Sequence, residues 1–231
     1  MNFRTHAVLT GVFFLITDVT AIVGLLLYQP LLNNPNFITS SDVNVTQISI
    51  GATLEIILAA CAAATSLTLY PILRMQNHSM ALGYVIFRAM EATIILIGVM
   101  CILTVLSLRL DFLAVGGDQS IYQAIGKAFT ALQKWTFLFG PNIILPINAT
   151  VLGYLLYRSR LVPRAISLLY LIDAPILFIS SMFILFGFYE QTSPFAILLA
   201  MPLLAFEISF SVWLIVKGFN QSALARLSAK N

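Results

Sequence analysis

The stretch YVIFRAMEATIILIGVM, residues 84–100, is apolar except for an arginine and a glutamate set within it. Arg88 and Glu91 are three residues apart, so a helix places both side chains on the same face. An ionised group facing lipid at the centre of a spanning helix costs about 3 kcal/mol or more. The stretch therefore predicts a membrane-spanning helix whose polar face points into the protein.

The composition is that of an integral membrane protein. Of the 231 residues, 60% are hydrophobic and only 9% are charged. Soluble domains carry about 25% charged residues, so this chain cannot cover a water-facing surface with polar groups. The net charge of +3 includes no basic run of the kind that binds nucleic acid. We therefore expect the lipid bilayer as the main partner and no nucleic-acid partner.

Six apolar segments are each long enough to span a bilayer, which takes about 20 apolar residues in a helix. They cover residues 7–28, 48–70, 80–108, 135–157, 165–188 and 194–216. No interval between them is long enough for a soluble domain. The sequence therefore predicts an all-α fold, with residues 1–231 forming one bundle of six transmembrane helices.

The connecting segments differ in their content of Lys and Arg, which sets the orientation of a membrane protein. Eight basic residues fall on one side: Arg4, Arg74, Arg158, Arg160, Arg164, Lys217, Arg226 and Lys230. The other side has Arg109, Lys127 and Lys134. Because cytoplasmic loops carry the excess of basic residues, we expect a multi-pass protein of the cell membrane with both termini in the cytoplasm.

Two of the connecting segments have a distinct character. Residues 29–47 are rich in Asn, Ser, Thr and Pro and are predicted to form an external loop. Residues 118–134 are amphipathic, with Lys127 and Lys134 opposite an apolar face. This segment predicts either a helix at the outer surface that leads into the fourth span, or a plain extension of that span.

Ionisable and amide side chains recur within the apolar segments at similar depths. The set is Asp18, Glu55, Arg88, Glu91, Asn148, Asp173 and Glu207. At about 1.5 Å per helical residue, most of them lie roughly 12–17 Å from the cytoplasmic end, near the middle of a ~30 Å hydrocarbon core. Because each would be costly against lipid, we predict that they point inward and form one polar core.

The second span carries a stripe of small residues that includes its glutamate. Gly51, Glu55, Ala59, Ala62 and Ser66 recur every three or four residues. Small residues at this spacing let two membrane helices approach closely. We therefore expect Glu55 to face a neighbouring helix or a narrow cavity.

The charges within the spans are unbalanced. Five carboxylic acids accompany a single arginine, and five ionised carboxylates cannot coexist with one guanidinium in a low-dielectric core. Arg88 is expected to pair with Glu91 or Glu207, and several of the other acids to be neutral. Such a set either holds helices in register or lines a pocket for a ligand, an ion or a reaction.

Several kinds of site are disfavoured. His6 and His78 lie at the membrane boundary, away from the acids, and Cys61 and Cys101 lie in apolar spans without ligand spacing. There is no HExxH, GxSxG, P-loop or dinucleotide-binding motif. We expect no metal and no cofactor, and an enzymatic role is not favoured.

An arginine cluster joins the fourth and fifth spans. Arg158, Arg160 and Arg164 lie within eight residues, with Pro163 opening the next helix. Basic residues at this place anchor a membrane protein to the cytoplasmic surface. The functional alternative is the binding of anionic lipid headgroups.

Short motifs along nearly the whole chain resemble one family. They are Leu54-Glu55, Leu69-Tyr70-Pro71, Phe87-Arg88 with Glu91-Ala92, Leu156–Pro163, Glu207 and Trp213–Phe219. In this order and spacing the sequence resembles a bacterial multi-pass membrane family known only as domain of unknown function 4386. The resemblance implies a small six-helix membrane protein and implies no mechanism.

Three classes of function fit the polar core. A small-solute or proton-coupled transporter requires a water-accessible cavity that reaches the acids from one side. A structural or partner-binding membrane subunit requires a closed, dry core with every acid satisfied. A membrane-embedded lipid-modifying enzyme requires a lateral opening toward the bilayer.

Overall fold

The computed structural model describes residues 2–34, 36–41 and 43–229, and every secondary-structure element in this part is helical. Lys230, which the sequence places among the cytoplasmic basic residues, lies outside the described residues. The elements are α1 (Phe3–Leu32), α2 (Val45–Leu73), α3 (His78–Val115), α4 (Gln119–Phe137), η1 (Leu138–Ile144), α5 (Leu145–Ser159), α6 (Arg164–Leu185), α7 (Pro194–Val216) and α8 (Gln221–Ser228). The predicted all-α class is confirmed.

Six helices in the described part of the chain are long and apolar enough to cross a membrane. They are α1, α2, α3, the continuous helix formed by α4, η1 and α5, then α6 and α7. Each begins or ends close to a span expected from the sequence, and polar turns lengthen several of them. The protein is therefore a multi-pass membrane protein with six spanning helices.

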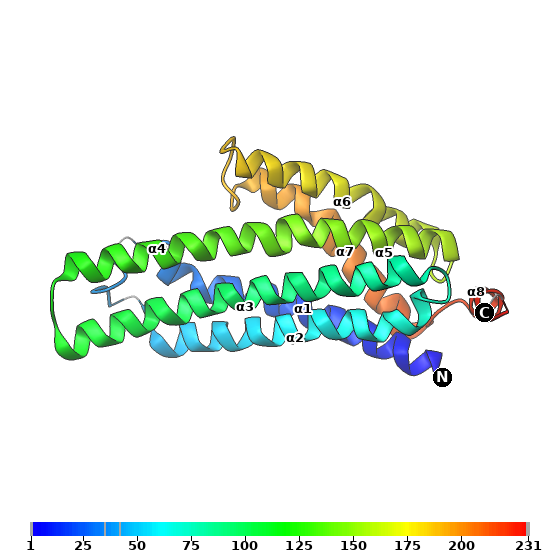
Figure 1. Ribbon diagram of the computed structural model, residues 1–231, viewed down its shortest axis with the longest axis horizontal. Helices are drawn as coiled ribbons and strands as arrows, with labels where there is room; N and C mark the ends of the chain where they lie inside the picture. The colour runs from blue at the N-terminus through cyan, green and yellow to red at the C-terminus, as the bar shows by residue number, and fades with distance from the viewer. Residues whose placement is uncertain (1, 35, 42, 230–231) are drawn as a thin grey trace.

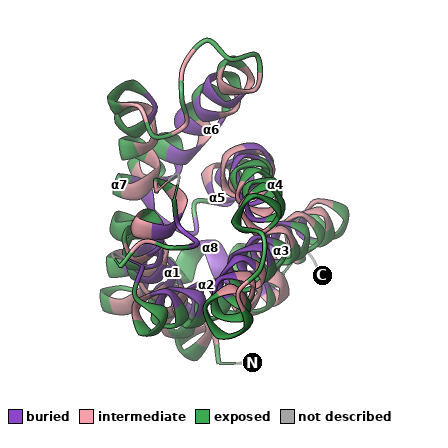
Figure 2. Cartoon of the chain, turned by 90° about the vertical axis from the view of Figure 1, so that its left-hand side faces the viewer, coloured by how far each residue is buried: buried purple, intermediate pink, exposed green. Residues whose placement is uncertain are grey.

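The helices run up and down along a common axis (Figure 1). The start of α1 lies at the same end as α8, and this end is called the termini end. The described loop residues 33–34, 36–41 and 43–44, together with residues 116–118 and 186–193, lie at the opposite, far end. The α6–α7 hairpin packs along one side of the other helices and diverges from them toward the far end (Figures 1 and 2).

The longest helices extend beyond a bilayer. α3 has 38 residues and is about 57 Å long at 1.5 Å per residue, against a hydrocarbon core of ~30 Å. The amphipathic segment 118–134 falls almost entirely in α4, which continues through η1 into α5 without a break. Ile121 and Leu132 are exposed, whereas Gly126 and Gln133 are buried against the bundle.

Close helix contacts occur where the sequence has small residues. All five members of the α2 stripe are buried. At Gly51 an added Cβ would lie 2.9 Å from Cε1 of Tyr28, and at Gly24 it would lie 3.1 Å from Cγ of Glu55. These distances leave no room for a side chain, so glycine allows α1 and α2 to pack against each other.

Two apolar cores stabilise the two ends of the bundle. The larger, near the termini end, includes Phe14, Tyr84, Leu152 and Phe210. The smaller, at the far end, seats Phe37 of the α1–α2 loop among residues of α2 and α3. Figure 2 shows the buried residues on the inward faces of the helices and the exposed residues outside.

The far-end loop is also held by a buried cation. Nη1 of Arg109 donates hydrogen bonds to the carbonyl oxygens of Phe37 (2.7 Å) and Ile38 (2.8 Å). Gly126 of α4 lies against the ring of Phe37 and has no space for a Cβ. Arg109 therefore fastens the loop between α1 and α2 onto α3.

Candidate functional site

The predicted polar core comes from six of the helices, and every member is buried. Asp18 lies on α1, Glu55 on α2, Arg88 and Glu91 on α3, Asn148 on α5, Asp173 on α6 and Glu207 on α7. Their exposed fractions range from 0% for Asn148 to 9% for Asp18. All seven side chains are therefore buried inside the helical bundle.

Arg88 is the centre of the hydrogen-bond network. Its Nη1 lies 2.9 Å from Oε2 and 3.1 Å from Oε1 of Glu91, so the pairing expected with Glu91 or Glu207 is made with Glu91. Its Nε donates to Oγ1 of Thr65 (3.2 Å) and to the carbonyl of Ala62 (3.3 Å) on α2. The guanidinium also lies over the ring of Phe14, 5.3 Å from its centroid. The ion pair thus ties α3 to α2 and α1.

Glu91 receives a third hydrogen bond from another helix. Nδ2 of Asn148 donates to Oε2 of Glu91 at 2.6 Å. Both oxygen atoms of this carboxylate are therefore engaged by charged or amide donors. A buried ion pair is stable when its remaining lone pairs are satisfied in this way. The Arg88–Glu91–Asn148 group is a fixed part of the protein interior.

Asp18 and Glu207 form a second, different group. The two carboxyl groups lie close together, one on α1 and the other on α7. The hydroxyl of Tyr170 donates to Oε1 of Glu207 (3.4 Å), and Oδ2 of Asp18 has no hydrogen-bond partner among the described residues. Two neighbouring carboxyl groups are thus buried between α1 and α7.

A cavity of about 450 Å³ lies against both groups. Five of the predicted polar-core residues line it: Asp18, Glu55, Arg88, Glu91 and Glu207. This volume is many times the ~30 Å³ of one water and falls in the 300–1,000 Å³ range of small-molecule sites. Most of its other lining is apolar. The acids therefore border a space large enough for a small solute.

The cavity begins at the polar core and extends toward the far end. On α3 it follows Arg88, Glu91, Ile95 and Gly98, the order in which that helix runs toward the far end. Ile22 on α1 and Ile197 and Met201 on α7 line the cavity and are also exposed. The cavity therefore reaches the surface between α1 and α7, where the α6–α7 hairpin diverges.

An aromatic layer closes the cavity on the termini side. The rings of Tyr170 and Phe206 are stacked with centroids 3.7 Å apart, and Phe206 stacks on Phe210 at 5.2 Å. Phe14 packs edge-on against Phe210 at 5.5 Å. All four side chains are 0% exposed, so nothing passes from the acids to the termini end in this conformation.

The wall of the cavity includes a distorted helix. η1 is a π-helix of seven residues that contains Pro141, and Pro141 and Asn142 both line the cavity. Proline cannot donate a backbone hydrogen bond, and π-helical turns of this kind often occur at functional sites. Nδ2 of Asn142 donates to the carbonyl of Phe137 (2.9 Å), which stabilises the widened turn.

Two of the seven predicted residues do not line the cavity. Asn148 acts through Glu91, as described above. Asp173 is 2% exposed on α6, and its Oδ2 has no hydrogen-bond partner among the described residues.

The structure adds polar residues that sequence reasoning missed. Thr65 and Tyr170 bond the charged groups directly, and Gln133 lines the cavity while being only 4% exposed. Thr and Tyr are common in membrane helices and carry no signal alone. Tyr170 does lie three residues before Asp173, on the same helix face, which is a usable signal.

The remaining predicted residues form a separate feature. Arg158, Arg160 and Arg164 are exposed and lie at the termini end, around the turn between α5 and α6. Among the described residues, no group of three or more His, Cys, Asp or Glu side chains is arranged to hold a metal ion.

Comparison with known families and proteins places this geometry in context. The family described as Domain of unknown function (DUF4386) matches residues 9–218, which include every residue of the cavity and the arginines of the α5–α6 turn. No curated protein and no solved structure matches the chain.

Proposed function

The chain belongs to the DUF4386 family, and we propose that it is a proton-coupled transporter of a small amphipathic cation. The observation that carries this proposal is the cavity of about 450 Å³ that reaches from the protein surface between α1 and α7 to Arg88, Glu91, Asp18 and Glu207. A structural subunit with a closed, dry core would not have a cavity of this size beside its ion pair.

The charge of the lining favours a cation. Four carboxyl groups line the cavity, on Asp18, Glu55, Glu91 and Glu207, against the single guanidinium of Arg88. Arg88 and Glu91 neutralise each other, and in the proposed mechanism Asp18 and Glu207 carry one proton and one negative charge between them. The apolar remainder of the wall suits an organic cation with an apolar body.

The Asp18–Glu207 pair supports coupling to protons. A cation that enters the cavity competes with the shared proton for the same two carboxyl groups. Because like charges repel strongly in a low-dielectric site, binding of the cation favours loss of the proton. This exchange is the step that an antiporter needs. The Arg88–Glu91 ion pair keeps its position beside the exchanging carboxyl groups.

The shape of the site supports alternating access. The acids are open toward the far end and closed by the stacked rings of Tyr170, Phe206 and Phe210 on the termini side. Pro175 and Pro202 lie inside the helices that carry these rings, and η1 contributes to the wall of the cavity. Such irregular helices are where transporter helices bend between two states.

We place the protein in the cell membrane with the termini end in the cytoplasm. Exposed basic residues gather at that end, among them Arg74, Arg158 and Lys217. The acidic residues outside the polar core that the structure describes, Asp111, Asp118 and Glu190, belong to the far end. This distribution follows the positive-inside rule, so the cavity would open away from the cytoplasm.

One observation favours a second candidate, a membrane-embedded enzyme acting on a lipid. The opening between α1 and α7 is bordered by exposed apolar side chains and so faces the acyl chains of the bilayer. A lipid could enter there with its headgroup near Asp18 and Glu207. Release of headgroup from phospholipid by the purified protein, followed by mass spectrometry, would select this candidate.

Transport of a fluorescent organic cation tests the first proposal. In proteoliposomes with an acidic interior, we expect uptake of ethidium that a protonophore abolishes and that protein-free liposomes lack. An ethidium gradient alone should move protons the other way, which pyranine fluorescence reports. Absence of both fluxes, for ethidium and for tetraphenylphosphonium, would contradict proton-coupled cation transport.

A further inference from the structure

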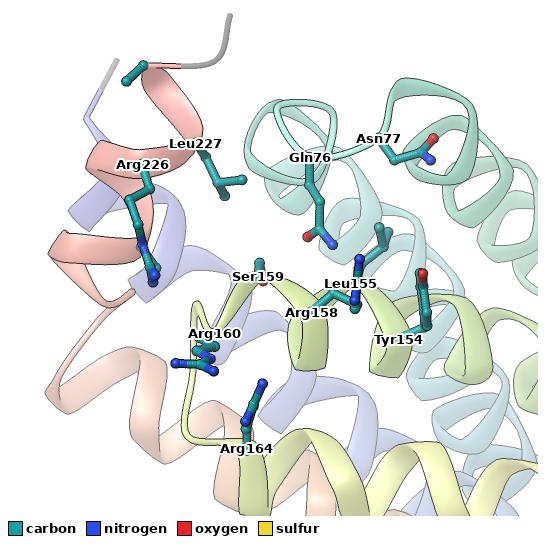
Figure 3. A pocket seen from close by; sticks show the side chains of 12 residues that line it. Gln76, Asn77, Tyr154, Leu155, Arg158, Ser159, Arg160, Arg164, Arg226 and Leu227 are labelled. Carbon is teal, nitrogen blue, oxygen red and sulfur yellow. The ribbon is translucent and has the colours of Figure 1, made fainter.

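A second cavity, of about 750 Å³, lies at the termini end and is separate from the acid-lined one. It is bordered by the end of α5, the α5–α6 turn, the α2–α3 turn and α8. Four arginines from two separate parts of the chain line it: Arg158, Arg160, Arg164 and Arg226 (Figure 3). We propose that this basic pocket binds a phosphate-bearing anion.

The pocket has no negative charge of its own. None of its lining residues is acidic. The three sequence segments that supply them, residues 56–90, 119–172 and 208–231, contain no Asp or Glu at all. Four guanidinium groups around one space repel each other, and a bound anion relieves this repulsion. The positive-inside rule explains basic residues at this end, but it does not explain their convergence on a cavity.

The arginines are placed by the fold. Arg160 has a left-handed backbone conformation, with φ of 59°, which non-glycine residues rarely adopt. The turn is held by the hydrogen bond from the backbone N–H of Asn220 to the carbonyl of Leu161 (2.9 Å). This bond brings the start of α8 to the α5–α6 turn. In Figure 3 the side chain of Arg226 extends from α8 toward that turn.

The helix α8 is therefore part of the pocket. Ala223 and Leu224 of α8 are buried in the larger apolar core, which fixes Arg226 on the side facing α5. A ligand that bridges Arg226 to Arg160 would hold α8 against the bundle. Replacing mutual repulsion by shared hydrogen bonds stabilises both segments.

A smaller cavity beside the first supports a phosphate ligand. It shares Arg160 and Arg164 and adds Trp213, whose Nε1 is buried without a hydrogen-bond partner among the described residues. The indole N–H and the guanidinium groups are all donors. Guanidinium groups bind phosphate oxygens in a bidentate manner, so these donors suit a group that offers acceptors alone. Tryptophan is also frequent at the headgroup level of the bilayer.

The phosphate can belong to an anionic lipid headgroup or to a soluble molecule, and thermal unfolding distinguishes the two. The protein is placed in nanodiscs of phosphatidylcholine, with or without phosphatidylglycerol, and separately in detergent with inorganic phosphate or pyrophosphate. We expect a higher Tm with phosphatidylglycerol or with the soluble anions. The arm that gives the rise identifies the source.

A matched pair of variants tests the pocket itself. R160Q/R226Q should weaken binding by roughly tenfold or more for each arginine, because each loses charge-assisted hydrogen bonds. R74Q/K217Q removes the same charge from the same end, outside the pocket, and should retain the shift in Tm.

The W135F background leaves Trp213 as the sole tryptophan. In this background the fluorescence of Trp213 should respond to the same ligand, and it should also confirm that R160Q/R226Q is folded. Equal losses in both double variants, or no shift in any arm, would overturn the proposal.

Discussion

Replacing Arg88 by methionine is expected to lower the free energy of unfolding by about 3–5 kcal/mol, because Glu91 would then be a buried carboxylate without its counter-ion. Arg88 is 2% exposed and Glu91 3% exposed, so the carboxylate of Glu91 would be only weakly hydrated after the loss of its partner. Thr65 and Ala62 on α2 would lose their hydrogen bonds as well. Thermal unfolding in detergent, followed by tryptophan fluorescence, measures the change.

A double variant separates the charge effect from simple loss of packing. R88M/E91Q removes both charges and keeps a carbonyl oxygen that can accept from Asn148. It should recover more than half of the stability lost in R88M, since a neutral pair costs less than one buried charge. Arg74 is exposed, so R74M should change little. If R88M and R74M were equally stable, the ion pair would not be the centre of the core.

Glu207→Gln is expected to abolish the coupling between cation uptake and the pH gradient while the protein still folds. Glutamine keeps the size of the side chain and can hydrogen-bond both Asp18 and Tyr170, but it has no proton to exchange. Ethidium uptake in proteoliposomes should then no longer follow an imposed pH gradient. The loss should be essentially complete, because this is the step proposed to join the two fluxes.

The control for this variant lies in a loop. Glu190 is an exposed acid between α6 and α7, away from the cavity, so E190Q should keep wild-type coupling. Unfolding temperatures of both variants show whether folding is intact. Coupled uptake that persists in E207Q would remove the Asp18–Glu207 pair from the mechanism.

The polar core could be predicted because an ionisable side chain that faces hydrocarbon strongly destabilises a membrane protein. For an ionisable residue such as Glu207, near the middle of an apolar segment, the favourable arrangement is one in which the side chain points into the protein interior. Depth follows from the rise per residue, so the common level of Asp18, Glu91 and Glu207 was visible in the sequence. The stripe of small residues around Glu55 likewise predicted that its helix packs closely against a neighbouring helix.

The cavity itself could not be predicted. Its position depends on how far the α6–α7 hairpin diverges from α1, which no local sequence pattern specifies. For the same reason Asp173, at the same depth as the others, is buried but does not line the cavity. Gln133 was missed because it lies in the amphipathic part of the helix, where a polar side chain is expected.

The convergence of Arg226 with the arginines of the α5–α6 turn was likewise invisible in the sequence. These residues are more than sixty positions apart along the chain. They meet because α8 folds back over the termini end and because Asn220 bonds the turn. The absence of acidic residues from the segments that line the pocket is the one property of the pocket that can be read from the sequence.

The most direct test of the central claim asks whether water reaches the acids from one side. Cys61 and Cys101 are both buried and are replaced by alanine, and a single cysteine is introduced at Ala21, which lines the cavity one turn from Asp18. A membrane-impermeant cationic methanethiosulfonate reagent is then applied to each side in turn. We predict modification of A21C from the far side only, prevented by ethidium, and none of A149C, whose position is 0% exposed. If A21C reacts from neither side, the core is closed and dry, and the transporter account is wrong.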